Sequence, residues 1–202
     1  MKFKELVLAS GNKGKVAEFN SLFADYGITV KAQSVLGVSD VAETGTTFVE
    51  NAIIKARHAS KITHLPAIAD DSGLVVEALG GAPGIYSARY AGVHGDNAAN
   101  NQKLLEALQN VANRKAKFMC VLVLMRNADD PSPIICQGEW HGEITDSAFG
   151  DGGFGYDPVF YVPKHQCTAA ELDKATKNAE SHRGQALKLL MPAISELLEK
   201  TP

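Results

Sequence analysis

The sequence of 202 residues has few cysteines and no long hydrophobic run. Its cysteines, Cys120, Cys136 and Cys167, are odd in number and lack CxxC spacing, which argues against both a disulfide framework and a zinc site. They are typical of reduced thiols, so we expect a cytoplasmic protein. Because no apolar stretch approaches the length of a signal peptide or a membrane span, we expect no membrane association.

An excess of positive charge is missing as well. The formal net charge is −3, so there is no global electrostatic case for binding nucleic acid, which usually requires a basic face. Hydrophobic residues make up 45% of the chain and can form a sizeable core, while charged residues, at 21%, are near the globular norm. Because no repeat or linker is visible, we expect residues 1–202 to form a single domain, into which a lobe can be inserted.

Apolar runs outline the strands. Buried strands are predicted at Leu6–Ala9, Ile28–Val30 and Phe118–Met125, the last of which is the strongest strand pattern in the chain. Apolar and polar residues alternate across residues 138–144. This alternation predicts a strand with one wet face and antiparallel neighbours.

Helix starts are indicated by capping boxes. Thr47 with Glu50 three residues later predicts one helix start, and Thr168 with Glu171 predicts another. The last helix of the chain contains Pro192, which should kink or interrupt it because proline cannot donate the backbone hydrogen bond of a helix interior.

Two adjacent carboxylates stand out in the stretch Ala67–Gly73. An apolar run enters this stretch and Leu74–Val76 leaves it, so a strand running into a turn would bring Asp70, Asp71 and Ser72 to the edge of the sheet. There they could meet a metal ion and a phosphate. Neighbouring aspartates repel each other unless a cation or a proton relieves them, so the pair suggests chemistry. The alternative is an ordinary turn, since these residue types are common in turns.

A glycine loop at Ser10–Lys15 follows the first predicted strand and precedes a helical pattern. Such a loop can point backbone N–H groups and a helix N-terminus at an anion, and Lys13 and Lys15 would add positive charge. The GxxxxGK[ST] spacing of a Walker loop is absent. The alternative is a plain strand-to-helix turn with two solvated lysines.

A second glycine-rich loop, residues 150–158, has aromatic and acidic residues among its glycines. Phe154 or Tyr156 could stack on a nucleobase, and Asp157 could accept a hydrogen bond from a base. The alternative is a tight turn with buried aromatic rings.

Two cations are expected at the start of the last helix. Ser181 is a good N-cap, so His182 and Arg183 would lie in the first turn, where the helix dipole disfavours positive charge. This placement suggests a tertiary or ligand partner for them, although surface arginines are also common.

Six segments, taken together, carry a resemblance to a known family. They are Ser10–Lys15, Glu43–Gly45 with Phe48–Ala52, Ala69–Leu74, Gly80–Arg89, Gly153–Pro158 and Ser181–Arg183. In this order they resemble the inosine/xanthosine triphosphate pyrophosphatases, house-cleaning enzymes that remove inosine, deoxyinosine and xanthosine triphosphates (ITP, dITP and XTP) from the nucleotide pool. The resemblance extends from Leu6 to about Leu190.

The resemblance implies an α/β fold with a long twisted mixed β-sheet, flanking helices and two lobes around a central cleft, usually in a homodimer. It also implies a Mg²⁺-dependent reaction in which water attacks the α-phosphorus and pyrophosphate leaves, with a nucleoside monophosphate as the other product. Related alternatives are a pyrophosphatase for a different modified nucleotide and a nucleotide sensor without turnover. The presence of both Glu43 and Asp71 argues against the sensor, which needs no catalytic acid.

The resemblance also implies a role for each site residue. Asp71 would be catalytic, and Glu43 and Asp71 would hold the metal, because Mg²⁺ takes few carboxylates and keeps waters and phosphate oxygens. Asp70 is given no role. The substrate would be bound by Ser10, Gly11, Asn12, Lys13, Gly14, Lys15, Lys55, Ser72, Phe154, Gly155, Tyr156, Asp157, Lys177, His182 and Arg183.

Overall fold

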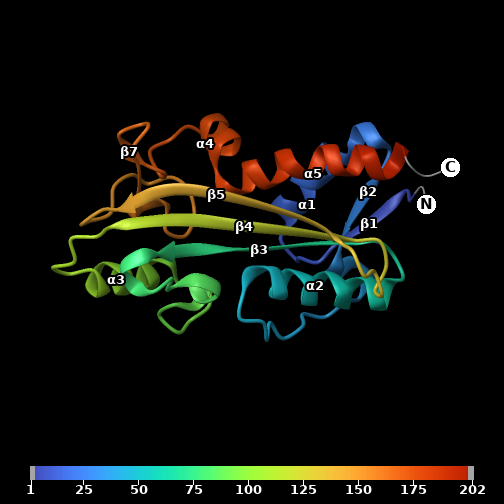
Figure 1. The fold of residues 1–202 in the computed structure, drawn as a ribbon, viewed down its shortest axis with the longest axis horizontal. Coiled ribbons are helices and arrows are strands. Elements are labelled where there is room, and N and C mark those ends of the chain that lie inside the picture. Colours follow the sequence, from blue (N-terminus) through green and yellow to red (C-terminus); the bar gives the residue numbers. More distant parts are fainter. Residues whose placement is uncertain (1–2, 200–202) are drawn as a thin grey trace. The chain divides into compact units, whose positions relative to one another are not determined.

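The computed structural model describes residues 3–199. The strands of this part of the chain are β1 (Glu5–Leu8), β2 (Thr29–Ala32), β3 (Ala67–Val76), β4 (Lys115–Met125), β5 (Ile134–Ile144), β6 (Phe160–Val162) and β7 (Cys167–Thr168). Its α-helices are α1 (Lys13–Phe23), α2 (Phe48–Thr63), α3 (Asn97–Ala107), α4 (Lys174–Glu180) and α5 (His182–Glu199), and short 3₁₀ helices connect several of these elements (Figure 1).

The strands form one sheet in the order β2-β1-β3-β4-β5-β6-β7. Strand β1 pairs in parallel with β2 and β3, whereas β6 pairs antiparallel with β5 and β7. The predicted α/β class with a mixed sheet is therefore confirmed, as are the antiparallel pairing of β5 and the strands predicted from the apolar runs.

The chain divides into two compact units. Unit 1 comprises the chain up to Asp71, Val121–Cys136 and the chain from Leu187 onward, and unit 2 comprises Ser72–Cys120 and Gln137–Ala186. The boundaries fall within β3, β4, β5 and α5, so these elements continue from one unit into the other. The single domain with a central cleft stays a prediction.

Unit 1 is built on β1, whose Leu6, Val7 and Leu8 are fully buried. Helix α2 lies on one side of the strands of this unit, and α1 lies on the other (Figure 1). The predicted capping box at Thr47 is confirmed, with the Thr47 side chain accepting a hydrogen bond from Glu50 N. The close packing of α2 follows from its small buried residues, which are Ala52, Ala56 and Ala59.

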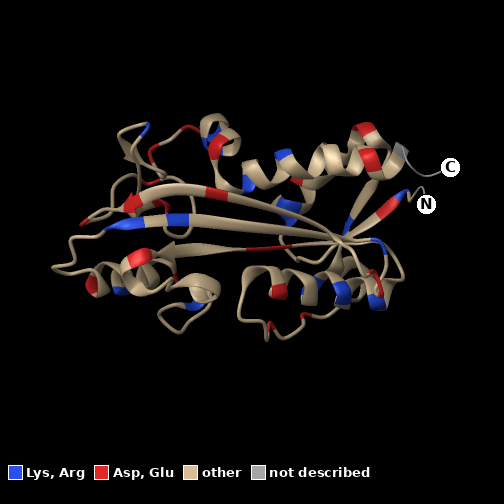
Figure 2. Ribbon diagram, viewed as in Figure 1, with Lys and Arg blue, Asp and Glu red and all other residues tan. Residues whose placement is uncertain are grey.

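Strand β3 corrects the prediction of a turn at the two aspartates. It runs unbroken to Val76, so Asp70 and Asp71 lie within the strand (Figure 2). Its neighbour β1 ends at Leu8, opposite Ile68. Asp70 and Asp71 thus lie just beyond the end of β1, although β3 itself continues. Burial of the apolar residues beyond them favours extended backbone over the turn that their composition suggested.

Two helix predictions also need correction. Glu171 does accept hydrogen bonds from Thr168 N and Oγ1, at 2.8 and 3.0 Å, but no helix follows them. Helix α4 begins only at Lys174, because the Asp173 side chain caps Thr176 N. In α5 the helix runs through Pro192 to Glu199, so Pro192 does not interrupt it, and the alternative of a kink stays a prediction.

Unit 2 has an aromatic core. The Phe118 ring lies 4.6 Å from that of Phe160 and 6.3 Å from that of Trp140. Trp140 is buried, as expected of a packing residue. Aromatic clusters of this kind bury large apolar areas, so they fix the positions of the strands that carry them.

The loop that joins β4 to β5 in unit 1 is held by a buried carboxylate. Asp130 is only 1% exposed and accepts hydrogen bonds from Arg126 Nε at 2.8 Å and from Arg126 N and Ser132 N at 3.0 Å each. Hydrogen bonding by the Arg126 side chain is the largest cause that lowers the pKa of Asp130, to about 2. The ionised form of Asp130 therefore stabilises the folded state.

We predict that Asp130→Asn lowers the free energy of unfolding by about 2 kcal/mol at pH 7. Because the folded pKa is depressed, this stabilisation is complete above the unfolded pKa and is lost as the pH falls through the folded value. The difference from wild type should therefore shrink to about half at pH 3. Urea unfolding at both pH values measures it. The exposed neighbour Asp129 is the control, and Asp129→Asn should change the stability by less than about 0.5 kcal/mol. A difference for Asp130→Asn that does not vary with pH would contradict the assignment.

Candidate functional site

The first glycine loop forms a self-capped helix start in unit 1. Helix α1 begins at Lys13, and the Asn12 side chain accepts hydrogen bonds from Gly14 N at 2.9 Å and Lys15 N at 3.2 Å. The Asn12 N–H in turn donates to Ser10 Oγ at 3.2 Å. The N–H groups of Gly14 and Lys15, which could otherwise face an anion, therefore already have a hydrogen-bond partner in the chain. The exposed Lys13 side chain and the helix dipole remain attractive to a phosphate.

Asp70, to which the resemblance assigned no role, is the partner of Lys15. The Lys15 ammonium lies 2.9 and 2.7 Å from the two carboxylate oxygens of Asp70. The Asp70 side chain is 4% exposed, and that of Lys15 is 26% exposed. The buried carboxylate therefore holds the lysine of the glycine loop in one place while its ammonium stays partly accessible.

Lys55, Glu43 and Asp71 meet in one cluster of unit 1. The Lys55 ammonium lies 3.1 Å from Glu43 Oε1 and 3.0 Å from Asp71 Oδ1. Lys55 comes from α2, Asp71 from β3 and Glu43 from the loop before α2. The cluster thus brings together the two carboxylates predicted to bind a metal, with a cation already between them.

Burial and charge oppose each other in this cluster. Burial raises the pKa of Asp71 above its usual value, and Lys55 opposes this rise only in part, while Glu43 adds to it. For Lys55, burial lowers the pKa, but the carboxylates of Asp71, Glu43 and Asp70 together raise it above its usual value. Asp71 is therefore a stronger base than an exposed aspartate, and Lys55 stays charged.

Asn51 belongs to this cluster, although the sequence analysis missed it. It is fully buried, and its Oδ1 accepts a hydrogen bond from Gly45 N at 2.9 Å, which ties the Glu43 loop to α2. Its amide lowers the pKa of the Asp71 carboxyl, although Asn51 Nδ2 makes no hydrogen bond of its own within the described residues. The signal in the sequence was a polar residue on the apolar stripe of α2, three residues after Phe48.

One carboxylate oxygen of Asp71, the catalytic candidate, lacks a hydrogen-bond partner in the described part of the chain. Within residues 3–199, Asp71 Oδ2 is buried and has no hydrogen-bond partner. A buried carboxylate oxygen without a partner is costly, so it points to a ligand or water that completes the site. In the same described range, no group of three or more His, Cys, Asp or Glu residues could hold a metal. A metal here would therefore depend on few protein ligands.

The second glycine-rich loop lies in unit 2 and is organised by Asp157. This buried carboxylate accepts hydrogen bonds from Phe154 N and from the Lys177 ammonium on α4. A Cβ at Gly153, where φ is +83°, would overlap the same carboxylate. The structure thus brings together Asp157 and Lys177, both predicted to bind the nucleoside. Asp157 also holds its own loop in place through the hydrogen bond from Phe154 N.

The two aromatic candidates of this loop differ in access. Phe154 is 77% exposed, whereas Tyr156 is 4% exposed and donates a hydrogen bond from its hydroxyl to Ser87 O at 2.8 Å. Burial also raises the pKa of Tyr156. The suggestion that the Tyr156 ring could stack on a base is therefore wrong, and Phe154 is the accessible ring. Gly155 contributes its carbonyl to a hydrogen bond from Asn101 Nδ2 at 3.0 Å.

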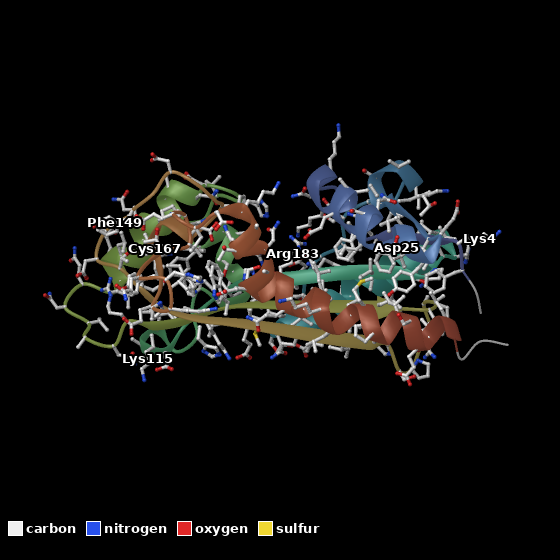
Figure 3. The ribbon with its side chains drawn as sticks, turned by 90° about the horizontal axis from the view of Figure 1, so that it is seen from above. Lys4, Asp25, Lys115, Phe149, Cys167 and Arg183 are labelled. Carbon is white, nitrogen blue, oxygen red and sulfur yellow. The ribbon has the colours of Figure 1, made fainter. Side chains whose placement is uncertain are left out.

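The remaining candidates for substrate binding are Ser72, His182 and Arg183. Ser72 is exposed on β3, directly after Asp71. Ser181 caps α5 as expected, with its Oγ accepting from Gly184 N at 3.3 Å. The His182 ring stacks on Phe118 with the ring centroids 4.9 Å apart, and Arg183 follows at the start of α5 (Figure 3). The unit 2 candidates thus gather on the glycine-rich loop and on the corner between α4 and α5.

The ion pair of Lys15 and Asp70 can be tested by a double-mutant cycle. Lys15→Met leaves a buried carboxylate without its lysine, so it should lower the free energy of unfolding by about 2 kcal/mol. Adding Asp70→Asn should recover most of this loss, with a coupling energy of at least about 1 kcal/mol. Lys13→Met, at an exposed lysine of the same loop, is the control with a change below about 0.5 kcal/mol. Thermal or urea unfolding measures Lys15→Met, Asp70→Asn, the double variant and Lys13→Met, and strictly additive effects of Lys15→Met and Asp70→Asn would refute the pair.

The chain matches the model of the Ham1 family over residues 6–193. Proteins named dITP/XTP pyrophosphatase from Pectobacterium atrosepticum and Vibrio cholerae are each 58% identical to it, over 95% and 96% of this chain and 98% of theirs. The solved structure of a HAM1 protein from Coxiella burnetii has a TM-score of 0.93 at 55% identity and covers 96% of this chain and 100% of that chain. The Ham1 protein of Staphylococcus aureus has a TM-score of 0.90 at 45% identity, with the same coverage. This chain belongs to the Ham1 family.

Proposed function

We propose that this chain hydrolyses dITP, XTP and ITP to the nucleoside monophosphate and pyrophosphate, and so removes these nucleotides from the nucleotide pool. Membership of the Ham1 family and the 58% identity to proteins named dITP/XTP pyrophosphatase support this activity. The observation that carries it is the cluster of Glu43, Lys55 and Asp71, in which a buried carboxylate oxygen is left for a ligand.

Mg²⁺ is the cofactor that we infer for this reaction. The donor set fits, because Asp71 Oδ2 lacks a partner within the described residues and the Lys55 ammonium, 3.0 Å from Asp71 and 3.1 Å from Glu43, shows that the cluster accepts positive charge. Glu43 and Asp71 would hold the ion. When bound, Mg²⁺ offsets the negative charge of the triphosphate and positions its oxygens.

Asp71 is the general base in this proposal. A water that donates its proton to the Asp71 carboxylate attacks the α-phosphorus, the bond to the bridging oxygen breaks, and pyrophosphate leaves with the electron pair of that bond. Its buried Oδ2, which has no hydrogen-bond partner within residues 3–199, gives Asp71 an oxygen that can face such a ligand or water. Lys13 and Lys15 balance the charge of the leaving pyrophosphate, and Asp70 keeps Lys15 in place for that task.

The candidates of unit 2 take the nucleoside. Phe154 offers an exposed ring for stacking on the base. Arg183 can only donate hydrogen bonds, so it can donate to the 6-oxo group of hypoxanthine or xanthine. It cannot pair with the 6-amino group of adenine, because two donors would then meet. A mismatch of this kind discriminates strongly, because a polar group is then left without a partner.

The homodimer and the cytoplasmic location stay predictions from the resemblance and from the cysteine pattern. Within residues 3–199, no helix has the length and apolar character needed to cross a lipid bilayer. The net charge of −3 gives nucleic acid no general electrostatic attraction.

A substrate panel with pyrophosphate detection tests the proposed function. We expect one pyrophosphate per dITP, XTP or ITP in the presence of Mg²⁺, with chelation of the metal abolishing turnover. The preference for dITP over dATP should be at least about a hundredfold if a donor mismatch at the base sets it. Release of orthophosphate alone, or cleavage of the common nucleotides while dITP is spared, would refute it. Selective cleavage of another modified nucleotide would favour the related alternative, and binding without cleavage would favour the sensor.

A further inference from the structure

The first turn of α5 is enclosed by backbone contacts within unit 2. On one side lies β5, where a Cβ at Gly138 would overlap the carbonyl oxygen of His182 and lie 2.7 Å from Ala186 N. Both partners are main-chain atoms, so neither can turn away as the end of a flexible side chain can. Gly138 therefore lets the helix start lie directly against the strand.

The other contact is between α5 and α4. A Cβ at Gly184 would overlap the carbonyl oxygen of Asn178 and lie 3.0 Å from its carbonyl carbon. Ser181 links the two helices, since its N–H donates to Lys177 O at the end of α4 and its carbonyl accepts from Gln185 N in α5, each at 2.9 Å. The Gln185 side chain also donates from Nε2 to Glu180 O on α4 at 2.9 Å. The corner between α4 and α5 is thus a closely packed backbone block.

Neither glycine is explained by backbone strain. Gly138 and Gly184 are absent from the positive-φ residues of the described chain, so L-residues could adopt their backbone conformations. Glycine in the interior of a strand or helix is destabilising relative to alanine, because it loses more backbone freedom on folding. The close approach of backbone is what these two positions need, and it offsets this cost.

Three residues of the proposed nucleoside site lie on this block. Lys177 ends in an ion pair with Asp157, His182 stacks on Phe118, and Arg183 follows in the first turn of α5. Their positions depend on how closely the block lies against β5. A shift of about 1 Å is enough to spoil a hydrogen bond to a ligand.

We propose that Gly138 and Gly184 are positioning residues that set the base preference of the enzyme, by allowing the corner of α4 and α5 to approach β5 and so placing His182 and Arg183. This inference rests on the proposed function. A Cβ at either glycine would meet atoms of α4 and α5, the elements that carry Lys177, His182 and Arg183. A side chain there should therefore weaken base recognition more than the chemical step.

A matched control lies in the same strand. A Cβ at Gly142 would overlap the carbonyl oxygen of Tyr161 and lie 2.7 Å from the Phe160 ring, so it creates the same kind of backbone clash against β6 instead of α5. Gly142→Ala therefore reports the cost of crowding β5 against β6 rather than against α5. It reaches His182 only indirectly, through the rings of Phe160 and Phe118.

The experiment compares Gly138→Ala, Gly184→Ala and Gly142→Ala by steady-state kinetics on dITP and dATP, with circular dichroism to check folding. For the first two we expect KM for dITP to rise about tenfold and the preference for dITP over dATP to fall about tenfold, while kcat changes by less than about threefold. Gly142→Ala should lower the preference by less than about threefold, even where it lowers stability, because its contact with His182 is indirect. An equal loss of preference in all three variants, or no loss in the first two, would overturn the proposal.

A milder variant covers the case in which the alanine variants do not fold. Ser181→Ala removes the cap on Gly184 N and should reduce the dITP preference by about threefold, because the first turn of α5, which carries His182 and Arg183, is then held less firmly. A folded Ser181→Ala variant with unchanged preference would then overturn the proposal. If the wild-type chain spares dITP, the proposed function fails and the inference fails with it, whereas unchanged glycine variants of an active enzyme refute the inference alone.

Discussion

The arrangement of unit 1 depends on one ammonium group between two carboxylates. Without Lys55, the carboxylates of Glu43 and Asp71 would repel each other as like charges, because the ammonium that contacts both would be missing. Helix α2 brings Lys55 to this position, β3 brings Asp71, and Asn51 ties the Glu43 loop to α2 through Gly45 N. A cluster that needs a cation to be stable is also one that attracts a metal ion and its phosphate ligands.

The same principle recurs in both units, because each buried carboxylate of the proposed site holds a lysine. Asp70 holds Lys15 beside the first glycine loop, and Asp157 holds Lys177 on α4. Lysine is a flexible side chain with high rotamer entropy, so a buried partner reduces the entropy lost when a ligand binds. The ammonium groups of Lys15 and Lys177 are thus already positioned before an anionic substrate binds.

Much of the fold and the candidate site could be predicted from local patterns. The apolar runs identified the main strands, the Thr47 capping box marked α2, and the glycine motifs led to both loops. The continuation of β3 could not be predicted locally, because Asp70 and its neighbours are ordinary turn residues and burial beyond them decides the conformation. The pairing of Asp70 with Lys15 and the close contacts of Gly138 depend on residues far apart in the sequence, so spacing alone could not indicate them. Asn51 carried a local signal, as a polar residue on the apolar stripe of α2, but not its contact with the Glu43 loop.

The central claim is that Asp71 performs the chemistry while Asp70 only supports the site, and the two adjacent buried aspartates allow a direct comparison. The measurement is the turnover of dITP by Asp71→Asn and Asp70→Asn, with nucleotide affinity determined by calorimetry on the same samples. We expect Asp71→Asn to bind dITP within a few-fold of wild type and to lose roughly a thousandfold in kcat, as removal of a general base does. Asp70→Asn should keep much more of its turnover. Equal losses in the two variants, or unchanged turnover in Asp71→Asn, would contradict the account.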